Sequence, residues 1–429
     1  MNDFLERRGI ERLLEADLAD EADRFEELGG RDLQLDEVLA RAGRINRRRR
    51  TTTVLVAAAA AVALVAPAGV LLDRDGTSAP APGPANHPTA PASPTPDPQV
   101  HRIGAFDALP RGARPATGYL AGDVWHGPDG STWQPPATPW GVLDIAPLGD
   151  GFLVGTPSEE LGQPTAMLVG ADGTVVHHWP MTGGFATSAG GHVVAFAQPD
   201  GTPVVVQDGG TKWYTMPRIT QGTGFRAVAV LGEDCKEQVP GGGGCTVFVN
   251  TTGRHPKAWA ATSHGIVDRA GQDLTGIGDV RSDGTLAGLT SYDEQTMSTC
   301  SKVEPPHGPG WRTCANRFGM FSPDGSELLA TNAIGDGLGD TVIDLLDART
   351  GDPVARYEVA SGPTTTGAIT GMRWEDDSHV LAIVFSDGRW AVLRVGLDGR
   401  VEVAVPPVRA HGADPTVSPF RLPARSSIG

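Results

Sequence analysis

Signatures of catalysis are missing from this chain of 429 residues. It has no Gly-x-Ser-x-Gly elbow, no His-Glu-x-x-His, no phosphate-binding P-loop and no Gly-x-Gly-x-x-Gly after a predicted strand. Its four cysteines include no Cys-x-x-Cys pair of the kind that binds zinc. The sequence therefore predicts no catalytic, cofactor-binding or metal-binding residue, and we do not expect an enzyme.

Positive charge is also in short supply. Lysine and arginine number 35 against 51 acidic residues, for a formal net charge of −16 and a pI near 5.1. Phosphate backbones require a basic surface, so nucleic acid is excluded as a partner of the main domain. Aromatic residues make up only 6% of the chain, whereas 57 glycines and 35 prolines favour short strands and turns over long helices.

One run of arginines interrupts the acidity, directly before the most apolar segment. It consists of Arg47, Arg48, Arg49 and Arg50. Residues 51–72 then form a stretch of 22 residues without a charged side chain. As a helix this stretch would be about 33 Å long, enough to cross a bilayer. Because such arginines stay in the cytoplasm, we expect a single-pass protein of the cell membrane, with its N-terminus cytoplasmic and its C-terminal domain extracytoplasmic. A cleaved signal peptide and a buried core helix are the alternatives.

The segments on either side of this transmembrane helix differ in composition. In residues 1–50, Leu14, Leu18 and Phe25 recur at helical spacing among acidic residues, which predicts a short cytoplasmic helical segment. Its apolar side is a candidate docking surface for a cytoplasmic protein; the alternative is a weakly folded tail whose arginines only set the topology. Residues 73–100 contain eight prolines and predict an extended extracytoplasmic stalk.

Residues 101–429 consist of short apolar runs separated by turn signals. Asp-Gly occurs ten times there, and this dipeptide suits tight hairpins because both central residues of a type I′ turn need positive φ. No extended helical periodicity appears, so an all-β, antiparallel domain is predicted. The pattern repeats about every 40 residues, most regularly at 321–359 and 369–405, and each unit supplies up to four strands.

Six such units follow one another, and the two ends of the domain supply a seventh. Gly118–Trp125 and Ser131–Gln134 lack a first strand, which Pro415–Leu422 can provide. Pairing strands from both ends closes a ring and removes free sheet edges. We therefore predict a β-propeller of about seven four-stranded blades. Six or eight blades and a pair of β-sandwiches are the alternatives.

The most regular unit carries a resemblance to a known repeat. Phe321-Ser-Pro-Asp-Gly325, an apolar strand and then Asp347-Ala-Arg-Thr-Gly351 resemble the WD40-like and TolB-like propeller repeats. The Trp-Asp dipeptide of true WD40 repeats is missing. The overall layout is similar to actinobacterial-type single-pass membrane proteins of unassigned function. The resemblance implies a binding scaffold and transfers no site residue.

The four cysteines all follow the predicted membrane segment, where disulfides form readily. They are Cys235, Cys245, Cys300 and Cys314, and they allow three pairings. The local pairing would bridge Cys235 to Cys245 and Cys300 to Cys314, each across an elongated insertion within a blade. Metal binding is the alternative.

Three other features have two interpretations. His177 and His178 are adjacent in a predicted strand, so their rings should point to opposite faces rather than share a metal. Residues 336–340 are acidic and rich in glycine, as in a calcium loop, but a plain blade loop is favoured. Several tryptophans could line a binding face, although packing between blades is the default. They are Trp125, Trp133, Trp140, Trp179, Trp213 and Trp374.

These observations lead to one functional hypothesis and two rivals. We expect a binding or sensing module for a protein, peptide or polysaccharide ligand, possessing no cofactor and signalling to a cytoplasmic partner of residues 1–50. A specific version is an anti-sigma-like regulator, for which no zinc-binding motif is present. The rivals are a propeller enzyme, either a hydrolase or a lyase, and a structural protein that binds the cell wall.

Overall fold

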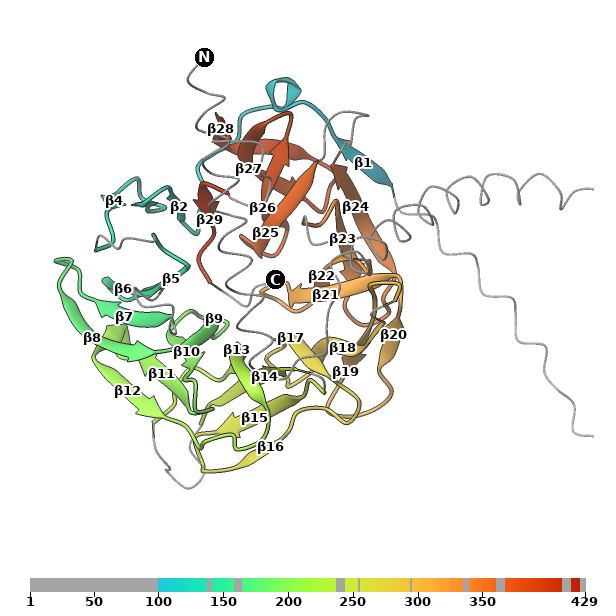
Figure 1. Ribbon diagram of the computed structural model, residues 1–429. Coiled ribbons are helices and arrows are strands. Elements are labelled where there is room, and N and C mark those ends of the chain that lie inside the picture. The colour runs from blue at the N-terminus through green and yellow to red at the C-terminus, as the bar shows by residue number, and fades with distance from the viewer. Residues whose placement is uncertain are drawn as a thin grey trace, which may run out of the picture. The chain divides into compact units, whose positions relative to one another are not determined.

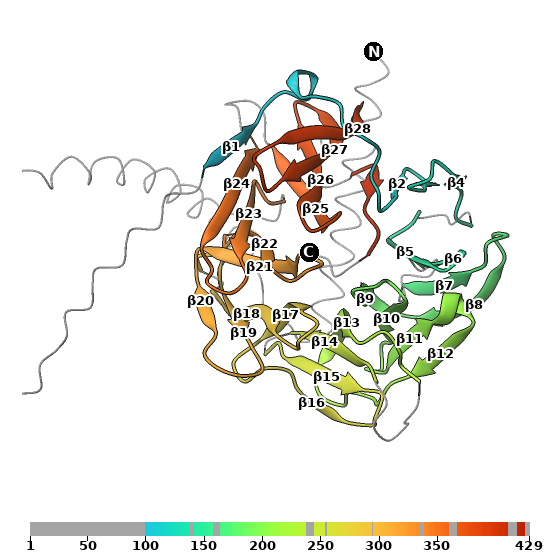
Figure 2. The ribbon, with the colours of Figure 1, turned by 180° about the vertical axis from the view of Figure 1, so that it is seen from behind.

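Seven sheets form a ring, like the blades of a propeller (Figure 1). The computed structural model describes residues 99–136, 141–157, 164–236, 244–253, 255–293, 295–334, 339–359, 367–410 and 418–424. Figure 2 shows the same ring from behind, with one strand of each blade near the axis and the others further out. The predicted all-β propeller with seven four-stranded blades is confirmed.

Each blade is an antiparallel meander, here numbered in order around the ring and written from the axis outward. Blade 1 consists of β29 (Phe420–Arg421), β2 (Tyr119–Ala121), β3 (Val124–His126) and β4 (Thr132–Trp133). Blade 2 consists of β5 (Asp144–Leu148), β6 (Gly151–Thr156), β7 (Thr165–Val169) and β8 (Val175–Pro180). Blade 3 consists of β9 (Thr182–Thr187), β10 (Val193–Ala197), β11 (Pro203–Gln207) and β12 (Lys212–Thr215), with the 3-10 turn η2 (Asp208–Gly210) before β12.

The remaining blades have longer strands on average. Blade 4 consists of β13 (Thr223–Leu231), β14 (Thr246–Thr252), β15 (Ala258–Thr262) and β16 (Val267–Arg269). Blade 5 consists of β17 (Gly276–Val280), β18 (Leu286–Asp293), β19 (Ser298–Glu304) and β20 (Trp311–Thr313). Blade 6 consists of β21 (Asn316–Phe321), β22 (Glu327–Asn332), β23 (Val342–Asp347) and β24 (Pro353–Val359). Blade 7 consists of β25 (Ala368–Trp374), β26 (His379–Ser386), β27 (Arg389–Gly396) and β28 (Val401–Arg409).

The Asp-Gly turns join these strands through a repeated local bond. In the β7–β8 turn, Asp172 Oδ1 accepts bonds from the amide and the hydroxyl of Thr174, at 3.0 and 2.7 Å. Asp129 and Ser131 repeat this arrangement in the β3–β4 turn. The intervening glycine has a positive φ, 81° at Gly173, which a side chain would disfavour. Aspartate, glycine and a hydroxyl residue therefore set these turns. The turns lie where the sequence predicts them, but the expected type I′ geometry is wrong for most: among the described Asp-Gly pairs only Asp387 has a positive φ, because in turns such as these the aspartate side chain bonds to the backbone of its own turn.

Closure of the ring joins the two ends of the domain. β29 pairs with β2, so the C-terminal segment supplies the inner strand of blade 1, as predicted. The strand expected at Gly118–Trp125 is, however, two strands, β2 and β3. The chain turns between them at Gly122, whose φ of 57° is accessible to glycine.

An additional strand precedes blade 1 and was not predicted. β1 (Val100–Ile103) pairs in parallel with β24 and adds a fifth strand to the outer edge of blade 6. The chain then passes through the short 3-10 turn η1 (Phe106–Ala108) and along blade 7 to β2. We call residues 104–118 the belt, because they connect blade 6 to blade 1 past blade 7.

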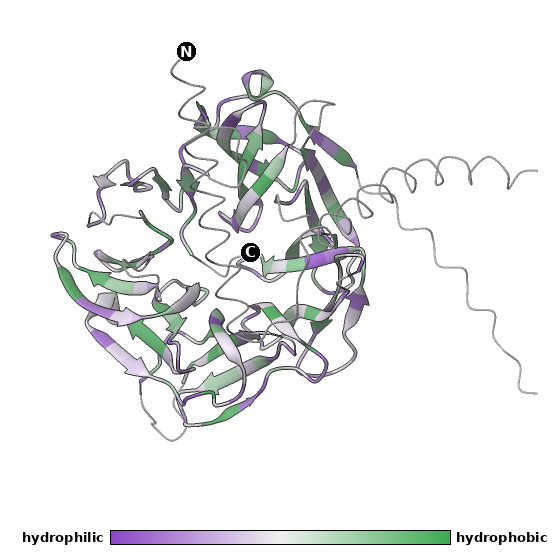
Figure 3. Ribbon diagram, viewed as in Figure 1, coloured by the Kyte–Doolittle hydropathy of each residue, from purple (hydrophilic) through white to green (hydrophobic). Residues whose placement is uncertain are grey.

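The core is divided into seven apolar clusters, one between each pair of neighbouring blades. Figure 3 shows the apolar positions along the strands of the blades. Between blades 6 and 7, Trp374 is 1% exposed and its indole donates to the Met320 carbonyl at 3.0 Å. Tyr357 is fully buried in the same cluster. Packing between blades, as expected for most of the aromatics, thus holds the ring together.

The membrane predictions fall on a part of the chain that is not described. Residues 51–72, the arginines Arg47 to Arg50 and the docking candidates Leu14, Leu18 and Phe25 all lie outside the described residues. Within the nine described ranges, none of the helical elements has the length and apolarity needed to traverse a bilayer.

Candidate functional site

The strands nearest the axis carry a different charge from the rest of the domain. Residues 101–429 contain 23 lysines and arginines against 35 acidic residues. The seven inner strands, in contrast, contain four arginines and two aspartates and no histidine. The six charged residues are Asp144, Arg226, Asp279, Arg317, Arg373 and Arg421. The inner strands of this acidic domain therefore carry more positive than negative charge.

Two of the six, Asp279 and Arg317, hold the ring together, and Asp144 bonds to its neighbouring blade in the same way as Asp279. Asp279 on β17 is 6% exposed and accepts the Phe321 amide of blade 6 at 2.9 Å. Arg317 on β21 forms an ion pair, at 2.8 and 3.0 Å, with Asp340 of the same blade, and the backbone of Asp340 bridges to Ile369 of blade 7. The inner strand of each blade has one edge without a neighbouring strand, so side chains provide hydrogen-bond partners for some of its backbone amides. These two residues serve the ring itself.

Asp144 begins β5 and is fixed by two backbone bonds. Its Oδ1 accepts the Ile145 amide at 2.9 Å, and its Oδ2 accepts the Phe185 amide of blade 3 at 2.7 Å. Desolvation raises the pKa of the Asp144 carboxyl to about 6, although the two amides and the charges of Arg226 and Arg421 oppose this shift. Asp144 as a whole residue is half-buried, whereas its carboxyl is enclosed deeply enough for desolvation to dominate its pKa.

Two glycines of β9 make room for the groups on either side of blade 3. A Cβ on Gly183 would lie 2.8 Å from Arg226 Cγ, so the arginine stem packs directly on this backbone. A Cβ on Gly184 would lie 2.7 Å from Asp144 Oδ2 and 3.9 Å from Arg226 Nη2. The carboxyl of blade 2 and the guanidinium of blade 4 therefore approach each other over a strand that has no side chain at this point.

Arg421 reaches the same place from β29. It is exposed, although desolvation lowers its pKa and the charge of Asp144 opposes that effect. The residues after it are held at three points: the Ala424 amide donates to the Ile145 carbonyl at 2.8 Å, Thr187 donates to the Ala424 carbonyl at 3.2 Å, and Arg373 donates to the Pro423 carbonyl at 2.7 Å. Blades 2, 3 and 7 thus hold the backbone of Pro423 and Ala424, just after Arg421.

Asp144, Arg226 and Arg421 form what we call the axial cluster. It brings together residues from blades 1, 2 and 4 over the glycines of blade 3. Even with Asp144 ionised, two guanidinium groups outweigh one carboxylate. Guanidinium groups bind oxyanions through paired hydrogen bonds, so this arrangement suits recognition of negative groups.

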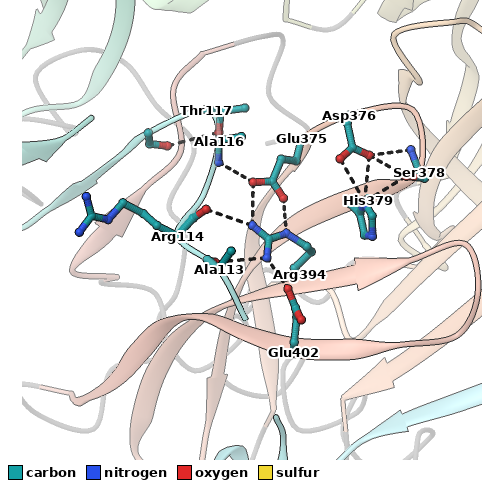
Figure 4. A network of polar contacts seen from close by, with 11 residues as sticks. Ala113, Arg114, Ala116, Thr117, Glu375, Asp376, Ser378, His379, Arg394 and Glu402 are labelled. Atoms are coloured by element: carbon teal, nitrogen blue, oxygen red, sulfur yellow. Dashed lines mark hydrogen bonds and ion pairs between the residues drawn. The ribbon is translucent and has the colours of Figure 1, made fainter. Parts of the chain in front are cut away.

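A second polar cluster lies in blade 7 and fastens the belt (Figure 4). Arg394 is 8% exposed and contacts both carboxyl oxygens of Glu375 as well as Glu402. It also donates to the carbonyls of Ala113 and Arg114, both at 3.2 Å. The guanidinium is thus surrounded by protein acceptors, and the role of this cluster is structural.

The two disulfides have the local pairing. Cys235 is bonded to Cys245 and Cys300 to Cys314. The first bridge is buried in the cluster between blades 3 and 4. The second was predicted to cross a loop insertion at residues 301–313. Instead, most of that segment belongs to strands β19 and β20, and the bridge joins the two strands at the open end of their hairpin. The pairing is confirmed and its setting in blade 5 is corrected.

The other candidates are dispersed. His177 packs between Trp179 and Trp213, with ring centroids 4.2 and 5.1 Å away, whereas His178 is exposed. Trp125, Trp179 and Trp374 are buried, and Trp213 is 42% exposed. Trp133 stacks on Phe152 at 4.2 Å, and Trp140 lies outside the described residues. Of the acidic loop at 336–340, only 339 and 340 are described, and Asp340 pairs with Arg317. In the described ranges no three potential ligands gather as a metal site would require.

The axial cluster was not found from the sequence. Its members are 82 and 195 positions apart along the chain, in segments without a motif. The signal available was Gly183-Gly184 inside a strand pattern, since glycine within a strand marks a close approach of other atoms. That signal gives no indication of which residues approach.

Comparisons with known proteins concern the fold. No family model and no curated protein matches the chain. Among solved structures it is similar to the β-propeller domain of the Trilobed protease from Pyrococcus furiosus, at 10% identity and a TM-score of 0.42 over 62% of this chain and 84% of that one. It is similar to U3-55K at 10% identity and a TM-score of 0.42, over 65% of this chain and 84% of that one. It is also similar to prolyl oligopeptidase B from Galerina marginata at 9% identity and a TM-score of 0.41, over 63% of this chain and 43% of that one. The sheet order itself shows the seven-bladed β-propeller, and these neighbours are reported only as similar structures.

Proposed function

We propose that this protein is a binding module displayed outside the cell membrane, which receives its ligand at the axial face of the propeller. The transmembrane helix at residues 51–72, the arginines before it and the stalk at 73–100 are part of this proposal. So is a cytoplasmic role for residues 1–50, which would report ligand binding to a protein partner.

The observation that carries the binding role is the reversal of charge on the inner strands. Arginines there are surrounded by an acidic domain, and charged side chains near a ring axis are costly unless they pair or bind. The two disulfides support placement in an oxidising compartment, because such bonds are rare in the cytosol. Both supports agree with the topology that Arg47 to Arg50 predict.

A topology experiment tests the placement. One reporter that is active only outside the cytoplasm and one that is active only inside are each fused after Gly429. We expect activity from the outside reporter alone, and protease added to intact cells should remove the propeller. Replacing Arg47 to Arg50 with glutamine is the matched control and should produce mixed orientation. Activity of the inside reporter alone would refute the proposal.

The cytoplasmic role has its own test. Alanine at Leu14, Leu18 and Phe25 should abolish recovery of a cytoplasmic partner in a pull-down, because the three side chains share one side of the predicted helices. Unchanged recovery would remove signalling from the proposal and leave the binding role intact.

An enzyme is the second candidate function, and Asp144 is the reason to retain it. Propellers with a hydrolase or lyase site need ionisable groups at the axis, and the residues found there are charged rather than neutral. A carboxyl whose pKa is about 6 is suited to transfer protons near neutral pH. Turnover that Asp144→Asn abolishes would favour this candidate over the binding module.

A further inference from the structure

We infer that β8, the outer strand of blade 2, joins two copies of this chain by pairing with β8 of the other copy, antiparallel and about a two-fold axis. β8 lies on the rim of the ring, next to β12 of blade 3 (Figure 1). Along its edge away from β7 it has no partner strand in the part of the chain that the structure describes. The inference goes beyond the axial binding role and does not depend on it.

β8 lacks the charges that protect the other outer strands. Its six residues, Val175–Pro180, include no acidic residue, lysine or arginine. In contrast, β12, β16, β20, β24 and β28 each contain at least one charged side chain, and β4 has only two residues. Charged side chains and short length are what keep a free strand edge from pairing. Of the outer strands that the structure describes, β8 is therefore the least protected.

Blade 6 shows that an outer strand of this fold accepts a further strand. β1 pairs in parallel with β24, from Arg356 to Val359. β24 begins with a proline and has a bulge at Val354, and β8 ends with a proline and has a bulge at Val176. Prolines and bulges also protect edges, but they do not keep β1 from β24. They are therefore no obstacle to pairing at β8.

Both halves of β8 carry apolar surface that is incompletely covered. Val175 and Val176 at its start are 47% and 56% exposed. Towards its other end, Trp213 of β12 stacks on His177 at 5.1 Å and makes an edge contact with Trp179 at 5.7 Å, yet it is 42% exposed. The indole is thus fixed against β8 while much of its surface remains in contact with solvent.

An antiparallel pair of β8 strands covers both halves at once. Because the strands run in opposite directions, the valines of one copy lie towards the Trp179 end of the other copy, where Trp213 is exposed. The two-fold axis repeats this contact, so each copy supplies both the valines and the indole. Aromatic and β-branched residues are favourable neighbours across strands, and no acidic or basic side chains of like charge oppose each other in this pair. A foreign strand would have to match this apolar pattern, whereas a second copy matches it by symmetry.

Sedimentation equilibrium of the full-length chain in a non-ionic detergent tests the inference. We expect a reversible equilibrium between one chain and two. Val176→Lys should weaken the dimer by about tenfold or more, because it removes apolar contact and puts a charge on the pairing edge of both copies. Val354→Lys is the matched control and should leave the dimer unchanged, since Val354 is also an exposed valine at the bulge of an outer strand. Thermal unfolding of both variants checks that the fold is retained.

Cross-linking tests whether β8 itself makes the contact. The four natural cysteines are all bonded in disulfides, so His178→Cys introduces the one free thiol of the chain. We expect a short bismaleimide to join two copies of this variant, because residues at the middle of β8 lie close to the two-fold axis. Val354→Cys is the control and should give no joined product.

Two results would overturn the inference. One is a chain that stays monomeric and gives no joined product. The other is a dimer that Val176→Lys leaves intact and that the His178→Cys variant does not cross-link, because the association would then belong to another part of the chain. If the purified His178→Cys variant is monomeric but is cross-linked to a different protein in intact cells, β8 pairs with a foreign strand and the second copy is refuted.

Discussion

Blade 7 and blade 1 are neighbours in the ring, yet they are built in opposite ways. Blade 7 comes from one continuous stretch of chain, and its strands have seven to nine residues. Blade 1 has strands of only two or three residues, and its inner strand comes from the other end of the domain. In β27 seven of eight residues are buried, whereas in β3 one of three is.

The difference shows which blade depends on its surroundings. The long strands of blade 7 form their own ladders and bury an indole between blades. Blade 1 has few ladder bonds, so the belt, the apolar clusters on both sides and the pairing of β29 with β2 must hold it. A strand pair this short is not stable by itself. Closure of the ring therefore depends on packing against blades 7 and 2 as much as on the strand pairing within blade 1.

The largest expected effect on stability comes from replacing one buried tryptophan in each blade, Trp374 in blade 7 and Trp125 in blade 1. Trp374→Ala should lower the free energy of unfolding by about 3–5 kcal/mol, because it leaves a cavity between blades 6 and 7 and an unpaired Met320 carbonyl. Trp125→Ala in β3 should cost less, because the short strands of blade 1 can relax into the space. Urea unfolding measures both values. An equal or larger loss at Trp125 would show that blade 1 is as rigid as blade 7.

The belt offers a second way to separate the two blades. Arg394→Met should cost about 3–5 kcal/mol, because it leaves Glu375, whose side chain is 2% exposed, without its cation. The loss should appear first in blade 1, as faster amide exchange in β2 and β3 than in β26. Adding Glu375→Gln removes the buried charge and should restore part of the stability. Uniform exchange across both blades would contradict a local role for the belt.

The two disulfides allow a comparison between a buried bridge, Cys235–Cys245, and a more exposed one, Cys300–Cys314. Loop closure alone predicts a slightly greater loss for Cys300–Cys314, whose cysteines are 14 positions apart, than for Cys235–Cys245, whose cysteines are 10 positions apart; both values are about 3 kcal/mol. Replacing both cysteines of a bridge by alanine should reverse this order, because Cys235 and Cys245 are each 2% exposed and also fill the core between blades 3 and 4. Urea unfolding of the two double variants decides between burial and loop length.

The smallest effect concerns pH and contrasts a turn with the axis. The ion pair with Arg281 holds the pKa of Asp283 below its usual range, so its stabilisation is present above pH 4 and is lost as the pH falls. Asp144 has a raised pKa of about 6, so its contribution is complete below pH 4 and is lost as the pH rises through 6.

Asp283→Asn should therefore cost up to about 1 kcal/mol at pH 7 and less at pH 3. Asp144→Asn should cost more at pH 4 than at pH 7. Thermal melts of both variants across this range provide the measurement. Parallel pH profiles would show that the two aspartates do not differ in environment.

Local chemistry determined most of the architecture. Asp-Gly followed by Ser or Thr sets the hairpin turns, alternation sets the strands, and a period near 40 residues sets the blades. The four strands predicted at 321–359 are close to β21, β22, β23 and β24 because each turn there is specified by its own residues. Closure by the C-terminal segment also followed from the sequence, because an incomplete unit at one end of the domain requires a strand from the other.

Tertiary structure alone decided what lies at the axis and on the outer edge. Asp144, Arg226 and Arg421 come near one another only because the ring gathers the inner strands of blades 1, 2 and 4 around its axis, and no local pattern records that arrangement. The attachment of β1 to blade 6 is likewise a long-range pairing, and it begins where the predicted stalk ends, at residue 100. Turns and strands depend on residues a few positions apart, whereas a site on the axis depends on how seven blades pack, which is why the fold could be predicted and the site could not.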